Sequence, residues 1–214
     1  AAGCNNRAGG QFSFVGGGAL NDSTGTSSTV GGGYDNCASG NWSSIVGGDT
    51  NCASGPHSFV GGGDTNCATS DNTTVAGGDS NKAIDDHAAV LGGDTNCAEG
   101  TCSVAVGGCG NWACGAITFI GGGDANHVCG NCSAIGGGQY NRMPASTNYS
   151  FIGGGASNCT CGNYSAIAGG NTNRSEATNT FIGGGTMNLI KSAHNCSTIV
   201  GSSLSSLSAN MLHT

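Results

Sequence analysis

Apolar and polar residues alternate along this chain in a pattern with a short, fixed period of about 15 residues. If one asparagine of each repeat is counted as position 1, position 3 is usually alanine, position 8 is serine or threonine, and position 10 is valine or isoleucine. Alternation with period two is typical of strands that turn one face inward. Positions 1, 3 and 5 and positions 8, 10 and 12 therefore predict two short strands in each repeat.

Asparagine marks the repeat at almost constant intervals. The step from Asn6 to Asn21 recurs along the chain, except that the step between Asn141 and Asn158 is longer by two, with the excess at residues 144–147. A similar two-residue excess follows Asn188. A fixed period of this kind is the signature of a repeat architecture. The column consists of Asn6, Asn21, Asn36, Asn51, Asn66, Asn81, Asn96, Asn111, Asn126, Asn141, Asn158, Asn173 and Asn188.

Glycine at position 5 and at positions 12 and 13 predicts the corners between the strands, because glycine adopts positive φ without steric cost. Two strands and two corners per repeat predict an all-β fold, a parallel β-solenoid (β-roll) of about 13 coils paired about 4.8 Å apart. We expect a solenoid domain over residues 1–203 and a degenerate C-terminal coil or tail over residues 204–214. A flexible glycine-rich linker, the alternative, would not hold β-branched residues at fixed spacing.

The asparagine column also has a predicted structural role. Position 1 shares a face with the alanine at position 3, so its side chain is expected inside, beside the Gly-Gly corner. A buried amide needs hydrogen-bond partners, and stacked amides one coil apart can bond to each other and to the corner backbone. We assign this ladder to Asn21, Asn36, Asn51, Asn66, Asn81, Asn96, Asn111 and Asn126.

Composition narrows the function classes. The 214 residues include 43 glycines, only 8% charged residues and a formal net charge of −7. Without a basic surface, nucleic acid is not an expected partner, and no apolar run approaches the ~18 residues of a membrane span. The chain begins with Ala1, which leaves a mature secreted product and a fragment both open. With no catalytic constellation or phosphate loop in the sequence, no enzymatic activity is expected.

The 13 cysteines indicate an oxidising, extracellular setting, in a secreted protein or one on a cell or virion surface. Cysteines at the same position in adjacent coils would stack within disulfide reach. We therefore expect a Cys114–Cys129 bridge at position 4. At position 2 we expect either Cys37–Cys52 or Cys52–Cys67.

Other cysteines carry weaker signals. Cys159 and Cys161 lie two apart on one strand and suit a mutual bridge poorly. The CxxC from Cys129 to Cys132 lacks a second pair at zinc spacing, so a zinc site is the less favoured interpretation.

Position 14 carries a column of acids. Stacked carboxylates repel each other, and calcium, which takes oxygen ligands, would remove that cost. In the alternative, each aspartate hydrogen-bonds its own turn while water screens its charge. The column consists of Asp49, Asp64, Asp79 and Asp94. Calcium is the one cofactor that the sequence suggests.

Outward columns supply candidate binding surfaces. Position 7 carries aromatic rings and histidines that could bind sugars, or that could be ordinary exposed side chains. Phenylalanine recurs at position 9, where it favours an interface over local packing at a corner. The interface candidates are Phe14, Phe59, Phe119, Phe151 and Phe181. Outward Asn-x-Ser/Thr motifs, which the repeat itself also generates, make Asn41, Asn148 and Asn163 glycosylation candidates.

The run SFVGGGDTNCA at residues 58–68 resembles repeats in the head domains of trimeric autotransporter adhesins and in phage and viral tail-fibre proteins. The resemblance extends over nearly the whole chain. The adhesin-head repeat is usually one residue shorter, with alanine where this chain has the column asparagine, and cysteines are atypical of it. The resemblance implies a parallel β-roll.

Three functions are compatible with these features. The first is a structural filament subunit that associates with itself end to end, because the repeat starts at residues 3–6 without an obvious polar cap. The second is an adhesin or tail-fibre head that binds surface glycans through outward aromatics. The third is an ice-binding solenoid, which needs a regular threonine column. Position 15 has Thr50, Thr65 and Thr95, but also Leu20 and Tyr140.

Overall fold

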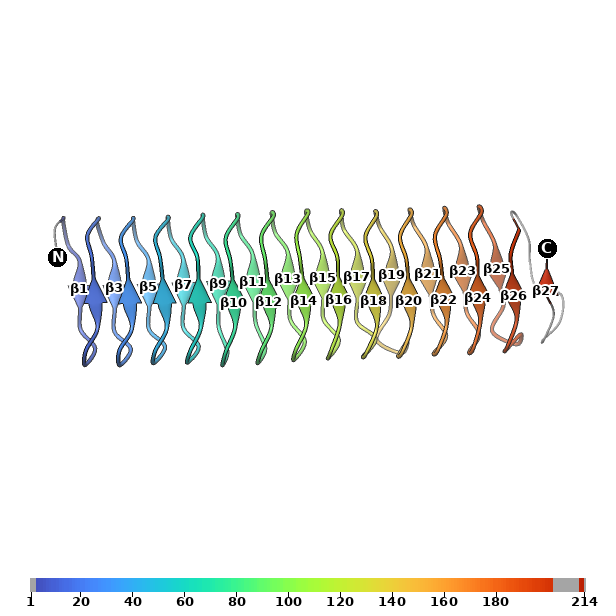
Figure 1. Ribbon diagram of the computed structural model, residues 1–214, viewed down its shortest axis with the longest axis horizontal. Helices are drawn as coiled ribbons and strands as arrows, with labels where there is room; N and C mark the ends of the chain where they lie inside the picture. The colour runs from blue at the N-terminus through green and yellow to red at the C-terminus, as the bar shows by residue number, and fades with distance from the viewer. Residues whose placement is uncertain (1–2, 202–211, 214) are drawn as a thin grey trace. The chain divides into compact units, whose positions relative to one another are not determined.

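The chain folds as an all-β parallel β-solenoid. The computed structural model describes residues 3–201 and 212–213. This part of the chain forms about 13 turns spaced about 15 residues apart, with two strands per coil and no helix. It divides into two compact units, Ala1–Gly108 and Cys109–Thr214. Within each unit, consecutive coils stack so that equivalent strands lie side by side (Figure 1).

In the first unit, the odd-numbered strands form one parallel sheet and the even-numbered strands form the other. Each strand contains two residues. The strands are β1 (Arg7–Ala8), β2 (Phe14–Val15), β3 (Asp22–Ser23), β4 (Thr29–Val30), β5 (Cys37–Ala38), β6 (Ser44–Ile45), β7 (Cys52–Ala53), β8 (Phe59–Val60), β9 (Cys67–Ala68), β10 (Thr74–Val75), β11 (Lys82–Ala83), β12 (Ala89–Val90), β13 (Cys97–Ala98) and β14 (Val104–Ala105).

The second unit has the same organisation, with odd and even strands in separate parallel sheets. Its strands are β15 (Trp112–Ala113), β16 (Phe119–Ile120), β17 (His127–Val128), β18 (Ala134–Ile135), β19 (Arg142–Met143), β20 (Phe151–Ile152), β21 (Cys159–Thr160), β22 (Ala166–Ile167), β23 (Arg174–Ser175), β24 (Phe181–Ile182), β25 (Leu189–Ile190), β26 (Thr198–Ile199) and β27 (Leu212–His213). The expected tail at residues 204–214 lies outside the described residues except for β27, which pairs in parallel with β26.

The register keeps equivalent positions in line. Cys37 pairs with Cys52 and Ala38 with Ala53, while Ser44 pairs with Phe59 on the other sheet. Regular pairing covers only positions 2–3 and 9–10, so the strands are shorter than the alternation predicts. Within a two-residue strand such as β5 or β6, the second residue faces inward and the first residue faces outward.

The core is a thin stripe between the two sheets. Position 10 supplies valine or isoleucine in most coils, and position 3 supplies alanine in most coils of the first unit. In the second unit larger residues fill position 3, including Val128, Met143 and Ile190, all fully buried. Because these side chains are small, backbone pairing and polar contacts at the corners must supply much of the stability.

The glycine at position 5 has a different role from the predicted one. Gly40 does not have positive φ, but a Cβ atom on it would lie 2.0 Å from the carbonyl oxygen of Gly55 in the next coil. The prediction that position 5 needs positive φ is therefore wrong: close backbone approach selects glycine there. Positive φ occurs instead at position 13 (Gly48, φ 98°), at position 12 in some coils (Gly62, φ 137°), and at the non-glycine positions 7 and 15 (Trp42, φ 56°; Thr50, φ 55°).

Hydroxyl groups at position 8 close the corner that follows the first strand of each coil. The side chain of Ser58 donates to the carbonyl oxygen of Gly55 at 2.6 Å, and Ser28 donates to Gly25 at 2.8 Å. Both two-residue insertions lie at this same corner, which absorbs them in extra turns without changing the register of the strands.

Candidate functional site

The asparagine column forms a continuous hydrogen-bond ladder within each unit. Asn51 is typical, with a side chain that is 1% exposed. Its Nδ2 donates to Asn36 Oδ1 at 3.0 Å and to the carbonyl oxygens of Gly47 and Gly63 at 3.1 and 2.9 Å. Its Oδ1 accepts from the backbone N–H of Asn66 at 3.0 Å. One amide thus joins two successive corners and the next asparagine.

The ladder is directional. Within each unit, the oxygen of a column asparagine accepts from the asparagine one coil later, as from Asn81 to Asn66 and from Asn188 to Asn173. The two axial sides of a coil are therefore different and complementary. The same contact recurs between adjacent coils of a unit.

A second, less regular ladder lies at the opposite corner, at position 6. The oxygen of Asn41 accepts from the backbone N–H of Thr26 at 3.0 Å, and Asn163 accepts from Asn148 at 2.7 Å. Asn131 and Asn195 make equivalent contacts. The sequence did not predict this ladder, although the recurring Asn-x-Ser/Thr motifs marked its members.

The glycosylation candidates Asn41, Asn148 and Asn163 all belong to this second ladder. Asn41 is exposed, and the other two are half-buried. The oxygen of Asn148 accepts from the backbone N–H of Asn131 at 2.8 Å. In contrast, Asn21 and Asn158 in the first ladder are fully buried although their sequence also fits the motif.

The aspartate column lies along a row of isolated bridges at the Gly-Gly corner. Each carboxylate accepts a hydrogen bond from the hydroxyl group of the following residue. The pairs are Thr50–Asp49 (2.7 Å), Thr65–Asp64 (2.7 Å), Ser80–Asp79 (2.8 Å) and Thr95–Asp94 (2.9 Å). These partners are side-chain hydroxyl groups of the same turn. A calcium ladder here stays a prediction.

One open depression lies beside this corner in the first unit. Its volume is about 320 Å³. The lining residues are Thr65, Ser80, Lys82, Thr95, Asn96 and Cys97.

The cysteines at position 4 form the disulfide that their spacing predicts. Cys114 and Cys129 are bonded, with their Cα atoms 4.6 Å apart. Both lie on the outward face of the β15–β17 pair, one coil apart. The other eleven cysteines form no disulfide bond within the chain.

The cysteines at position 2 are not bonded, which corrects the predicted Cys37–Cys52 or Cys52–Cys67 bridge. A hydrogen bond joins the thiol groups of Cys52 and Cys67 instead. This bond lowers the pKa of Cys67 to about 7, with help from Lys82 in the next coil, and it raises the pKa of Cys52. Cys67 is therefore the more easily ionised thiol of the two.

Cys159 and Cys161 are closer than their spacing suggested. Their Sγ atoms lie 2.9 Å apart, although both thiols are free. The hydrogen bond from Cys159 lowers the pKa of Cys161 to about 7, and Arg174 acts in the same direction. Because side chains alternate along extended backbone, Cys159 and Cys161 lie on the same face, near this arginine.

His127 lies against the bonded cysteines, a contact that the sequence did not predict. Its Nε2 atom lies 2.9 Å from Cys129 Sγ and 3.3 Å from Cys114 Sγ. Burial, followed by the charge of Arg142, lowers the pKa of this imidazole. Positions 2 and 4 share one outward face. The repeat register could therefore have predicted that His127 at position 2 lies near the cysteines at position 4.

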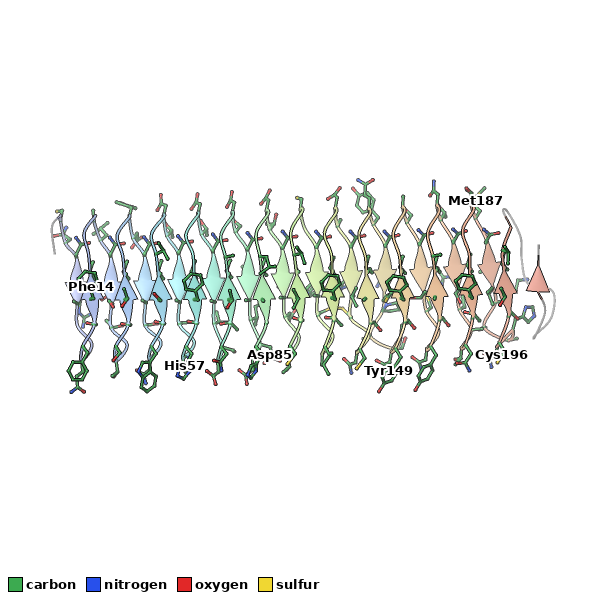
Figure 2. All side chains as sticks on the ribbon, in the orientation of Figure 1. Phe14, His57, Asp85, Tyr149, Met187 and Cys196 are labelled. Atoms are coloured by element: carbon green, nitrogen blue, oxygen red, sulfur yellow. A yellow bond between two sulfur atoms is a disulfide. The ribbon has the colours of Figure 1, made fainter. Side chains whose placement is uncertain are left out.

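The position 7 corner carries exposed aromatic pairs. Trp42 stacks on His57 with ring centroids 5.1 Å apart, and Tyr149 stacks on Tyr164 at 5.0 Å, each with an interplanar angle of 3°. Trp42 and Tyr149 are each 56% exposed. Figure 2 shows His57 and Tyr149 projecting at the corners of their own coils. In each pair the two rings are stacked with parallel planes, so each ring covers one face of the other and keeps its second face and its edge for contacts.

The position 9 phenylalanines lie on the outer face of the even-numbered sheets, as Phe14 does in Figure 2. Each is accompanied by glycine at position 11, and an added Cβ on Gly121 would lie 3.4 Å from the ring of Phe119. Phe119, Phe151 and Phe181 are 41–47% exposed. Positions 9 and 11 hold no charged residue within the described ranges. The result is a flat, uncharged face in each unit.

No family model matches the chain, and no curated protein matches it. In the part of the chain that the structure describes, no helix has the length and apolar character needed to span a bilayer.

Proposed function

We propose that the chain is an extracellular structural protein, a subunit of a fibre built by end-to-end stacking of β-solenoids. The observation that carries this proposal is the directional asparagine ladder. Its donor and acceptor sides differ, so a contact between the two ends of two copies is heterologous and does not close. If repeating this contact never brings the last copy back to the first, the copies add in a line and form a fibre instead of a ring.

The first described coil supports the same proposal. β1 pairs with β3, and Arg7 and Ala8 are exposed, whereas the equivalent Ala38 is fully buried between two coils. The outer edge of β1 is therefore exposed, and a further coil could pair with it and cover Ala8. Preceding chain or a second copy can supply that coil, and a fibre requires the second copy.

Blocking this edge tests the proposal. Ala8→Lys adds a charge to the inward position of the first coil, which is tolerated in a monomer because Ala8 is exposed. A docked copy would bury that charge at a cost of several kcal/mol, so association should be lost. Sedimentation velocity in the presence of reductant should show large species for the unmodified chain and single chains for Ala8→Lys.

Lys82→Glu is the matched control, because Lys82 is exposed on the outward face of β11 and should not affect stacking. A chain that sediments as a monomer at every concentration would contradict the fibre proposal. Equal assembly by Ala8→Lys would show that association uses another surface, such as the phenylalanine face.

A glycan-binding adhesin or tail-fibre head is the second candidate. The stacked pairs Trp42–His57 and Tyr149–Tyr164 favour it, because exposed flat rings pack well against the apolar face of a sugar. The resemblance of residues 58–68 to adhesin-head repeats is consistent with this function. The double variant Trp42→Ala/Tyr164→Ala should abolish retention on a glycan array; retention that this double variant keeps would exclude the two aromatic pairs.

The proposed extracellular location is supported by the Cys114–Cys129 disulfide, since such bonds persist in oxidising compartments. Detection of this bond in protein isolated from its natural source with thiols blocked at harvest would support the location. Complete reduction in such a sample would count against it.

A further inference from the structure

A compact Cys-His-Cys cluster lies on the outward face of the odd-numbered sheet in the second unit. β15 and β17 are paired so that Trp112 lies beside His127. Cys114 follows β15, and Cys129 follows β17 at the equivalent position. The parallel register thus gathers two sulfur atoms and one imidazole from two coils onto a single small surface.

The histidine ring is held with one nitrogen directed at the sulfurs. The rings of Trp112 and His127 stack with centroids 4.6 Å apart and planes 12° apart. Nε2 lies 2.9 Å from Cys129 Sγ and 3.3 Å from Cys114 Sγ. Both cysteines and the histidine are half-buried, and their ligand atoms lie within 4.8 Å of one another. It is the only such group of three among the described residues.

In the disulfide-bonded form, the three ligand atoms lie closer together than the ligands of a tetrahedral metal centre. Zinc bonds thiolate sulfur at about 2.3 Å and imidazole nitrogen at about 2.0–2.1 Å, which places ligand atoms about 3.5–3.8 Å apart. Opening the disulfide would free the two sulfur atoms to move apart to these separations. Two thiolates and one imidazole leave the fourth position for water or another ligand.

The geometry points to a redox-gated zinc site formed by Cys114, His127 and Cys129. In the oxidised chain the two sulfurs are bonded to each other, and the site is closed. A dithiol reductant transfers two electrons and two protons, breaks the S–S bond and is itself oxidised to a disulfide. The two thiols then bind Zn²⁺ and release two protons, while His127 supplies its Nε2 lone pair.

The zinc site is independent of fibre assembly, because it lies on an outward face away from the axial contacts. The bonded pair thereby has a second role besides bracing two coils. The cluster would hold zinc when reduced and release it when oxidised.

Cobalt binding tests the site, because Co²⁺ occupies zinc sites and gives thiolate charge-transfer and tetrahedral d–d absorption. The full chain is reduced with a phosphine under anaerobic conditions and titrated with Co²⁺, followed by displacement with Zn²⁺. We expect a tetrahedral site in the reduced chain, with these bands absent from the oxidised chain. His127→Gln should weaken the affinity of this site by at least about 10-fold and change its d–d spectrum.

Two controls separate this site from the other thiols. His87→Gln changes an exposed histidine in the first unit and should leave the titration unchanged. The double variant Cys159→Ser/Cys161→Ser removes the close dithiol elsewhere and should keep the His127-dependent bands. Circular dichroism confirms that each variant is folded. An unchanged titration in folded His127→Gln, or no tetrahedral binding by the folded, reduced chain, would overturn the proposal.

Discussion

The side-chain oxygen of Asn51 accepts a hydrogen bond from the backbone N–H of Asn66, one coil further along the chain, at 3.0 Å. Both side chains are almost completely buried. The contact is equivalent to those at Asn36–Asn51 and Asn66–Asn81. One residue type therefore fixes the register of the solenoid and satisfies the backbone of its tightest corner.

Replacing a column asparagine should destabilise the chain. In Asn66→Ala, the carbonyl oxygens of Gly62 and Gly78 and the N–H of Asn81 lose their side-chain partner. We expect a loss of about 1–3 kcal/mol in the free energy of unfolding, measured by urea denaturation. The control is Asn72→Gly, at an exposed position with φ 55° that glycine accepts easily. Equal stability of both variants would count against the ladder.

Gly40 at position 5 should be far less replaceable than Gly47 at position 12, which does not have positive φ. In Gly40→Ala the new Cβ atom would meet the carbonyl oxygen of Gly55 at 2.0 Å. In Gly47→Ala its nearest neighbour would be the carbonyl oxygen of Gly32 at 3.8 Å. Thermal unfolding should show a loss of about 1–3 kcal/mol or more for Gly40→Ala and little change for Gly47→Ala. The reverse order would contradict the close approach between coils.

Reduction of the disulfide should lower stability. The Cys114–Cys129 bond closes a loop with a sequence separation of 15. A loop of that length corresponds to about 3 kcal/mol of chain entropy in the unfolded state. We expect a loss of about that size in urea denaturation when a dithiol and a metal chelator are added. Cys114→Ser should show the same loss of stability without reductant. A further loss when reductant is added to this variant would mean that a different disulfide stabilises the chain.

Thiol reactivity should differ sharply among the free cysteines. The hydrogen bond from Cys159 lowers the pKa of Cys161 to about 7, while burial raises the pKa of Cys97 to about 11. The thiolate is the reactive form, so a lower pKa gives more reactive sulfur at neutral pH. Alkylation of the reduced chain followed by mass spectrometry should therefore label Cys161 well before Cys97 at pH 7. The rate at Cys161 should level off above pH 7, whereas the rate at Cys97 should keep rising up to about pH 11. Equal rates at pH 7 would contradict these assignments.

The sequence alone predicted the features that follow from the length of the repeat and from which positions share a face. The constant interval between asparagines determined the solenoid, and the parity of position 1 with position 3 placed the asparagines inside. Stacking at one position also predicted the Cys114–Cys129 pair. The same rule failed for Cys52 and Cys67, because bonded and unbonded pairs share the same stacked register and the spacing does not distinguish them.

Features that depend on side-chain direction or backbone approach could not be predicted in this way. The role of Gly40 depends on the carbonyl oxygen of Gly55 in the next coil. The position of His127 beside two sulfurs depends on its stacking against Trp112. Periodicity shows which residues share a face, but it does not give the rotamers that bring their atoms together.

Electron microscopy of the purified chain in negative stain tests the fibre proposal most directly. If the directional ladder continues from one copy to the next, the chain should form long unbranched threads of uniform width, and Ala8→Lys should form only short particles. Isolated short particles from the unmodified chain, at concentrations where Lys82→Glu also remains dispersed, would contradict end-to-end stacking.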